Sequence, residues 1–95
     1  MHFIVHALDK PGALPVRLAH YEAHRAYLSR AKIKTLISGP LVADDGETMI
    51  GSCFLVEAKS KDEVLAFHNA DPFKAAGVWA QVHIHPFLKR VDNRT

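Results

Sequence analysis

The order of strand-like and helix-like segments is the feature that most restricts how this chain of 95 residues can fold. Four segments read as β-strands and two as α-helices, in the order strand, helix, strand, strand, helix, strand. The predicted strands are residues 2–8, 33–42, 48–57 and 78–88, and the predicted helices are residues 13–31 and 60–69. This order predicts an α+β ferredoxin-like sandwich, in which two helices cover one face of a four-stranded antiparallel sheet.

Short sequence signals mark several of these boundaries. Ser60 and Glu63 have the spacing of a capping box at the start of the second helix. Pro72 ends that helix, because the residue before a proline is disfavoured in the α region. Residues 44–47 read as a hairpin turn. Pro40 has no N–H to donate to a neighbouring strand, so the strand that contains it is predicted to be bulged or at a sheet edge.

Length and composition limit the class of protein. A chain of this size forms one domain, which we expect to span residues 1–95. Apolar residues make up 48% and charged residues 23%, which excludes a disordered chain. The formal charge is only +2 and both signs are interspersed, so no nucleic-acid partner is expected.

No apolar run approaches about 18 residues and the first strand does not resemble a signal peptide. We therefore expect a cytoplasmic protein with no membrane partner.

The predicted sandwich leaves one sheet face uncovered, because two helices cover only the other. Strand alternation places apolar side chains on that uncovered face, where water is a poor neighbour. A second copy of the chain would bury it economically. The fold therefore predicts a homodimer.

The first predicted helix carries the most informative polar residues. Arg17, His20, His24 and Tyr27 are spaced by three, four and three residues and so share one stripe, beside the apolar stripe that would face the core. A histidine at this boundary is partly shielded from water, and its ring changes charge near neutral pH, which suits proton transfer. The alternative is that these residues lie on the helix surface with no role.

Several histidine pairs have spacings that metal ligands use. His20 and His24 lie one helical turn apart, but the acidic residue between them is one position too late for the His-Glu-x-x-His zinc motif. Two further pairs share a strand face, and these are His2 with His6 and His83 with His85. Because no cysteine or carboxylate accompanies them, no metal site is predicted.

Asp71 is the second candidate. An aspartate before a proline is a standard N-cap, here for a helical turn over residues 72–76 closed by Gly77. Its carboxylate could also orient a histidine ring and stabilise the imidazolium. The two interpretations are compatible, since a carboxylate has two oxygens.

The remaining candidate residues are better explained by structural roles than by catalytic ones. Gly39 and Pro40, with the Ser38 hydroxyl beside them, read as a bulge at the sheet edge, because no nucleophile elbow surrounds the serine. Cys53 is a lone thiol, which excludes an intrachain disulfide, and it is expected to be a small core residue. No phosphate loop or dinucleotide motif occurs, so no cofactor is predicted.

A set of short motifs resembles the YciI-like (YCII-related) family along nearly the whole chain. The motifs are Arg17-Leu18, Ala23-His24, Tyr27-Leu28, Ser38-Gly39-Pro40-Leu41, Asn69-Ala70-Asp71-Pro72-Phe73, Ala75-Ala76-Gly77-Val78 and Pro86-Phe87. The resemblance implies a dimeric α+β barrel like that of muconolactone isomerase, and an active site centred on His24 and Asp71. One branch of the family resembles dehydrochlorinases of chlorinated hydroxyhydroquinones. The sequence departs from the family where Arg-Pro often precedes Ala-His, because Tyr21 and Glu22 stand there.

Together these observations predict a small cofactor-independent enzyme of the lyase or isomerase type. His24 would be the general acid or base and Asp71 would hold and polarise its ring. The residues expected to bind a small cyclic or aromatic hydroxylated or carbonyl substrate are Arg17, Ser38, Gly39, Pro40 and Phe73. Two alternatives remain open, a non-catalytic dimeric module that binds a small molecule and a metal-dependent enzyme.

Overall fold

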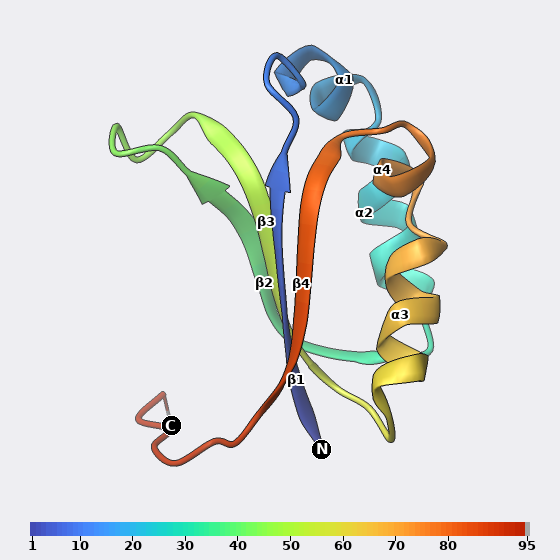
Figure 1. Cartoon of the computed structure of the whole chain (residues 1–95), viewed down its shortest axis with the longest axis vertical. Coiled ribbons are helices and arrows are strands. Elements are labelled where there is room, and N and C mark those ends of the chain that lie inside the picture. Colours follow the sequence, from blue (N-terminus) through green and yellow to red (C-terminus); the bar gives the residue numbers. More distant parts are fainter. Residues whose placement is uncertain (95) are drawn as a thin grey trace.

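The computed structural model describes residues 1–94 and has the predicted element order (Figure 1). The strands are β1 (His2–Asp9), β2 (Lys34–Val42), β3 (Met49–Glu57) and β4 (Trp79–Phe87). The helices are α1 (Leu14–Ala19), α2 (Tyr21–Arg30), α3 (Lys61–Asn69) and α4 (Pro72–Ala75). The predicted ferredoxin-like α+β sandwich is confirmed.

The sheet is antiparallel throughout, with the strand order β2-β3-β1-β4. All of the helices lie on one side of it, as Figure 1 shows. β2 is an edge strand with two register irregularities, between Thr35 and Ile37 and between Leu41 and Val42. The missing N–H of Pro40 is tolerated at such an edge, as the sequence predicted.

The first helix differs from its prediction, because the segment 13–31 is broken at His20 into α1 and α2. The backbone of His20 leaves the helical region, at φ −109° and ψ 8°. Its ring Nδ1 lies 3.0 Å from the carbonyl oxygen of Val16, which already accepts the backbone N–H of His20. This local side-chain bond competes with continuation of the regular helix. The chain changes direction there, so Arg17 and His24 belong to different helices.

The core lies between the sheet and the helices. Alternate residues of the two central strands point into it, namely Phe3, Val5 and Ala7 of β1 and Phe54 and Val56 of β3. The helices and β4 contribute Val64, Phe67, Phe73, Trp79 and Ile84. Burying each large apolar side chain stabilises the fold by about 1.5–3 kcal/mol.

His68 packs α3 against β4 by stacking on Trp79, with ring centroids 4.5 Å apart. The residue is buried, and its Nε2 has no hydrogen-bond partner among the described residues. Burial lowers the pKa of His68 from its ordinary value of 6.5, the ammonium group of Lys74 lowers it further, and the charge of Asp71 partly opposes both effects. The neutral ring is therefore the form that the fold accommodates.

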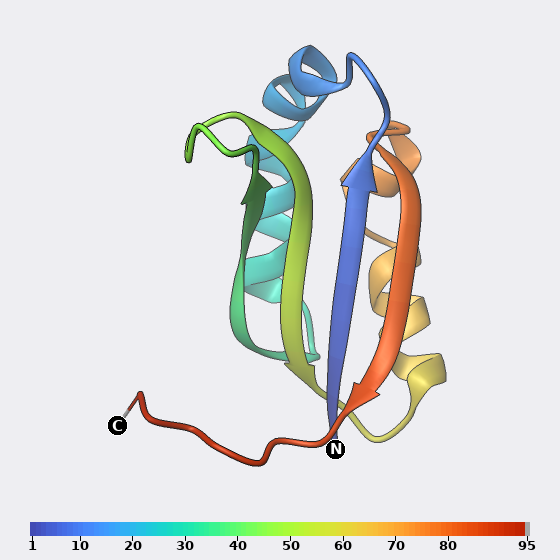
Figure 2. The same cartoon turned by 60° about the vertical axis from the view of Figure 1, so that its left-hand side comes forward.

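The opposite face of the sheet carries no helix in the described part of the chain (Figure 2). It presents Ile4 of β1, Ile37 of β2 and Leu55 of β3. Cys53 also lies on this face, half-buried, and not in the core as the sequence suggested, because the core takes its neighbour Phe54 and adjacent strand residues point to opposite faces. This surface is called the open face below.

Gly51 of β3 lies directly against the backbone of β1 and has no room for a side chain. A Cβ atom there would overlap the carbonyl oxygen of Ala7, and it would lie 3.0 Å from Leu41 Cδ1. We expect Gly51→Ala to lower the free energy of unfolding by about 1–3 kcal/mol, because backbone atoms cannot move aside as a side chain can. Denaturant titration measures the change. The control is Gly39→Ala, whose added Cβ has no heavy atom within 4 Å; equal stability of the two variants would contradict the prediction.

His68 should make the fold sensitive to acid. Because its pKa is lower in the folded protein than in the unfolded chain, the unfolded chain binds more protons below about pH 6.5. The stability given by the neutral ring is complete above that pH and is lost as the pH falls through the folded value. His68→Phe keeps the stack on Trp79, and we expect it to lose less unfolding free energy between about pH 7 and about pH 5, by at most about 1.4 kcal/mol per pH unit. Exposed His20→Gln should keep the wild-type slope; an unchanged slope in His68→Phe would refute this assignment.

Candidate active site

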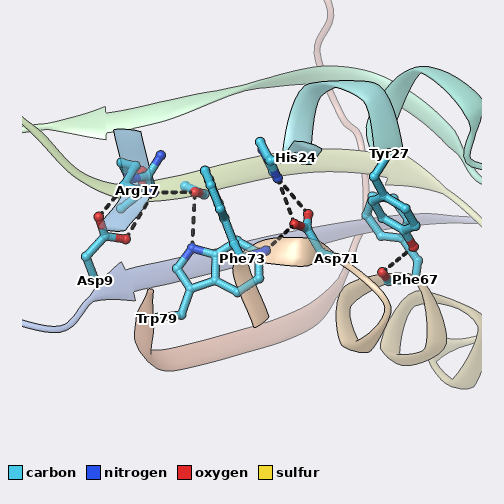
Figure 3. A network of polar contacts seen from close by, with 10 residues as sticks. Asp9, Arg17, His24, Tyr27, Phe67, Asp71, Phe73 and Trp79 are labelled. Carbon is cyan, nitrogen blue, oxygen red and sulfur yellow. Dashed lines mark hydrogen bonds and ion pairs between the residues drawn. The ribbon is translucent and has the colours of Figure 1, made fainter. Parts of the chain in front are cut away.

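His24 and Asp71 meet in the interior although 47 residues separate them in sequence. His24 of α2 is 8% exposed and Asp71, which precedes α4, is 2% exposed. Nδ1 of the imidazole lies 2.8 Å from both carboxylate oxygens (Figure 3). A carboxylate only accepts hydrogen bonds, so Nδ1 carries the hydrogen and Nε2 is left to exchange a proton.

Asp71 is held in place by the chain around it. Its Oδ1 accepts the backbone N–H of Phe73 at 2.9 Å, which makes it the N-cap of α4. Its own N–H donates to the carbonyl oxygen of His68 at 3.2 Å. The structure therefore contains both contacts that the sequence allowed, the cap and the bond to an imidazole, and the cap fixes the direction in which the carboxylate faces His24.

Aromatic rings hold the imidazole of His24 in one orientation. The ring stacks on Phe73 with centroids 4.0 Å apart and planes 5° apart. Phe54 and Trp79 meet it edge-on, with centroids at 6.2 Å and 6.4 Å. Together with the bond to Asp71, these contacts leave the ring little freedom to turn.

Arg17 is a second buried polar group next to this pair. Its Nε donates to Asp9 Oδ2 at 2.8 Å, and its Nη2 bonds to Asp9 Oδ1 at 3.0 Å, to the carbonyl oxygen of Gly51 at 2.8 Å and to Ser52 Oγ at 2.7 Å. The guanidinium carbon lies 4.9 Å from the ring centroid of Phe73. Phe73 thus contacts both Arg17 and His24, and it links the two polar groups (Figure 3).

A pocket of about 240 Å³ opens between the first two helices and the β2–β3 hairpin. Five of its lining residues were candidates from the sequence: Arg17, His24, Ser38, Gly39 and Pro40. Asp71 lies behind His24. Phe73, which the sequence suggested as a substrate-binding residue, is fully buried and does not line the pocket, because its ring is covered by His24 and Arg17.

Six residues of the pocket wall were not among the predicted site residues, and these are Tyr21, Arg25, Leu28, Met49, Ser52 and Phe54. Helical spacing from His24 could have identified Tyr21 and Leu28, which lie three positions before it and four positions after it on α2. The strand residues needed the register, because Ser38 pairs with Phe54 and Pro40 pairs with Ser52. That register could not be read from the sequence.

Tyr27, the last member of the predicted polar stripe, does not reach the pocket. Its hydroxyl donates to the carbonyl oxygen of Phe67 at 2.6 Å, and its ring stacks on that of Phe67. Burial, helped by the charge of Asp71, raises the pKa of Tyr27. Tyr27 therefore joins α2 to α3 as a neutral side chain.

Within residues 1–94, no group of three or more His, Cys, Asp or Glu side chains is arranged to hold a metal ion. Within the same range, every helix is too short or too polar to cross a membrane.

Comparison with known proteins agrees with the resemblance seen in the sequence. The family described as the YCII-related domain matches residues 1–88. Protein YciI of Escherichia coli is 33% identical over 96 residues, which cover 94% of this chain and 98% of that protein. An uncharacterized protein of Haemophilus influenzae is 32% identical with the same coverage.

A solved structure is also similar, that of the 5-chloro-2-hydroxyhydroquinone dehydrochlorinase TftG from Burkholderia phenoliruptrix in complex with 2,5-dihydroxybenzoquinone. The TM-score is 0.83 at 39% sequence identity, and the match covers 93% of this chain and 94% of that one. With the fold and the family match in agreement, this chain belongs to the YCII-related, or YciI-like, family.

Proposed function

We propose that this protein is a small enzyme that uses His24 and Asp71 for general acid–base catalysis on a hydroxylated or carbonyl-bearing ring. The observation that carries the proposal is the buried imidazole–carboxylate pair at the wall of a pocket. Its separation of 2.8 Å is the hydrogen-bond distance that such chemistry requires. The pocket volume of about 240 Å³ suits a single substituted ring.

In this proposal Nε2 of His24 takes a proton from the substrate, and the imidazolium that forms releases it to water after the leaving group has departed. Asp71 keeps the hydrogen on Nδ1 and stabilises the imidazolium that forms. Nε and Nη2 of Arg17 already donate hydrogen bonds to protein acceptors. In this proposal Nη1 therefore donates to a substrate oxygen on which negative charge develops. No further co-reactant is needed for a proton transfer of this kind.

The similarity to a dehydrochlorinase favours an elimination as the reaction type. In the keto tautomer of a chlorinated hydroxylated ring, a hydroxyl O–H bond breaks and its proton passes to His24. The freed electron pair forms a carbonyl and moves through the conjugated system to the carbon that bears chlorine. The C–Cl bond breaks and chloride leaves with the bonding pair, so that the net change is loss of HCl.

The proposal includes a homodimer formed through the open face. The middle of that face carries apolar side chains beside histidines of β1 and β4, and its charged pair, Lys34 with Glu57 at 3.8 Å, lies at one end. Exposed Ile37 and half-buried Leu55 are cross-strand partners there. Burial against a second copy would remove the exposed apolar side chains of this face from water.

The catalytic part is tested with 5-chloro-2-hydroxyhydroquinone under anaerobic conditions, with release of chloride as the measurement. We expect His24→Gln to lower kcat by about 10²–10⁴-fold, the range that positioned acid–base groups supply. Asp71→Asn, which keeps an oxygen for the α4 cap, should lower kcat by a similar factor because the ring loses its fixed tautomer.

Exposed His20→Gln is the control and should keep full activity. A folded His24→Gln variant with wild-type kcat would refute the mechanism. Binding of the ring compound with no turnover by the wild-type protein would favour a non-catalytic binding module instead.

The dimer is tested by placing a charge on the open face. Ile37 is 47% exposed in the protomer, so Ile37→Lys should not harm the fold, but it would bury an unpaired ammonium group in the dimer. We expect a monomer in sedimentation equilibrium. The matched control is Leu65→Lys on α3, where the leucine is 38% exposed, and it should remain dimeric. A monomeric wild-type protein, or an Ile37→Lys dimer, would contradict this interface.

A further inference from the structure

Arg25 is the cation on the pocket wall that lacks a carboxylate partner within residues 1–94. The wall contains three basic side chains, and two of them bond to a carboxylate. These are Arg17, which bonds to Asp9, and His24, which bonds to Asp71. Arg25 is exposed and forms no ion pair with any described residue, even with Glu22 three residues earlier on the same helix. Its guanidinium is therefore free to bind a ligand.

None of the described residues that line the pocket is acidic. Its polar members are Arg17, Tyr21, His24, Arg25, Ser38 and Ser52. Asp9 and Asp71, which bond to Arg17 and His24 on the wall, are themselves buried and do not line the pocket. A ligand thus meets positively charged and neutral donors, and only Arg25 among them carries a charge that no protein group balances.

We propose that Arg25 selects a substrate with a carboxylate, so that the pocket takes a hydroxylated ring carboxylic acid. This inference rests on the proposed function and specifies its substrate class. A planar guanidinium matches a carboxylate with two parallel hydrogen bonds. A ring phosphate fits less well, because it would bring close to two negative charges to one unbalanced cation.

The position of Arg25 separates recognition from chemistry. Arg25 follows His24 directly and lies one helical turn after Tyr21, so it is exposed at the mouth while His24 is buried. Leu28 and Met49 supply apolar wall for the ring. A carboxylate on Arg25 would leave the hydroxylated side of the ring facing His24 and Arg17.

The experiment compares 2,5-dihydroxybenzoate with 2,5-dihydroxybenzamide, which have the same ring and nearly the same size but differ in charge. Isothermal titration at neutral pH gives Kd for both compounds with the wild-type protein, Arg25→Gln, Arg25→Lys and Arg30→Gln. Arg30 is the matched control, because it is an exposed arginine on α2 that does not line the pocket.

We expect the wild-type protein to bind the carboxylate about tenfold more tightly than the amide, as a charge-assisted pair allows. Arg25→Gln should remove that preference by weakening binding of the carboxylate alone, and Arg25→Lys should keep part of it. Arg30→Gln should behave as the wild type does. The preference should also shrink as salt is added, because Arg25 is exposed.

Three results would overturn the inference: equal affinity for the two compounds in the wild-type protein, binding of neither, or a carboxylate preference that survives in Arg25→Gln, which would assign it to Arg17. These results are separable from failure of the catalytic proposal. His24→Gln should still prefer the carboxylate while losing turnover, so chemistry and charge selection are measured independently.

Discussion

The buried carboxylate of Asp71 is the group on which the rest of the structure depends. An ionised carboxylate in the interior is costly unless its oxygens are bonded. Here the imidazole of His24 and the N–H of Phe73 satisfy them. The same bonds fix α4 against α2 and set the face that the imidazole shows to the pocket. Stability and site geometry therefore have one cause, and Asp71 serves the fold whether or not a substrate is present.

Part of this arrangement could be predicted from the sequence. The element order gave the sandwich, and helical spacing placed Arg17 and His24 on one stripe. The partnership of His24 with Asp71 came from the family resemblance, because no local pattern connects residues 47 positions apart. The prediction that Tyr27 shares a site with these residues was wrong, because its hydroxyl bonds to the carbonyl oxygen of Phe67 and does not reach the pocket.

The features that could not be predicted from the sequence depend on strand register, which decides the sheet face on which each side chain lies. Adjacent strand residues point to opposite faces, so a shift of one position exchanges core and surface. Cys53 and Phe54 illustrate this, since both are apolar and only their register places the thiol on the open face. Arg17 depends on register in the same way. Arg17 bonds to Gly51 and Ser52, which follow it by 34 and 35 residues in the sequence. These residues are within its reach because of the register in which β3 pairs with β1.

The distribution of charge around the pocket explains how one small site could both attract an anion and transfer protons. Two of the three basic side chains on the wall face buried carboxylates, so the region next to His24 is close to neutral when its ring is protonated and has about one negative charge when the ring is uncharged. A strong positive field there would oppose protonation of the imidazole, and general-base chemistry needs that step. Placing the unbalanced cation at the exposed mouth avoids this conflict, because water screens Arg25 from the ring. In the proposed mechanism, charge selection and proton transfer are therefore compatible because they occupy different depths of the pocket.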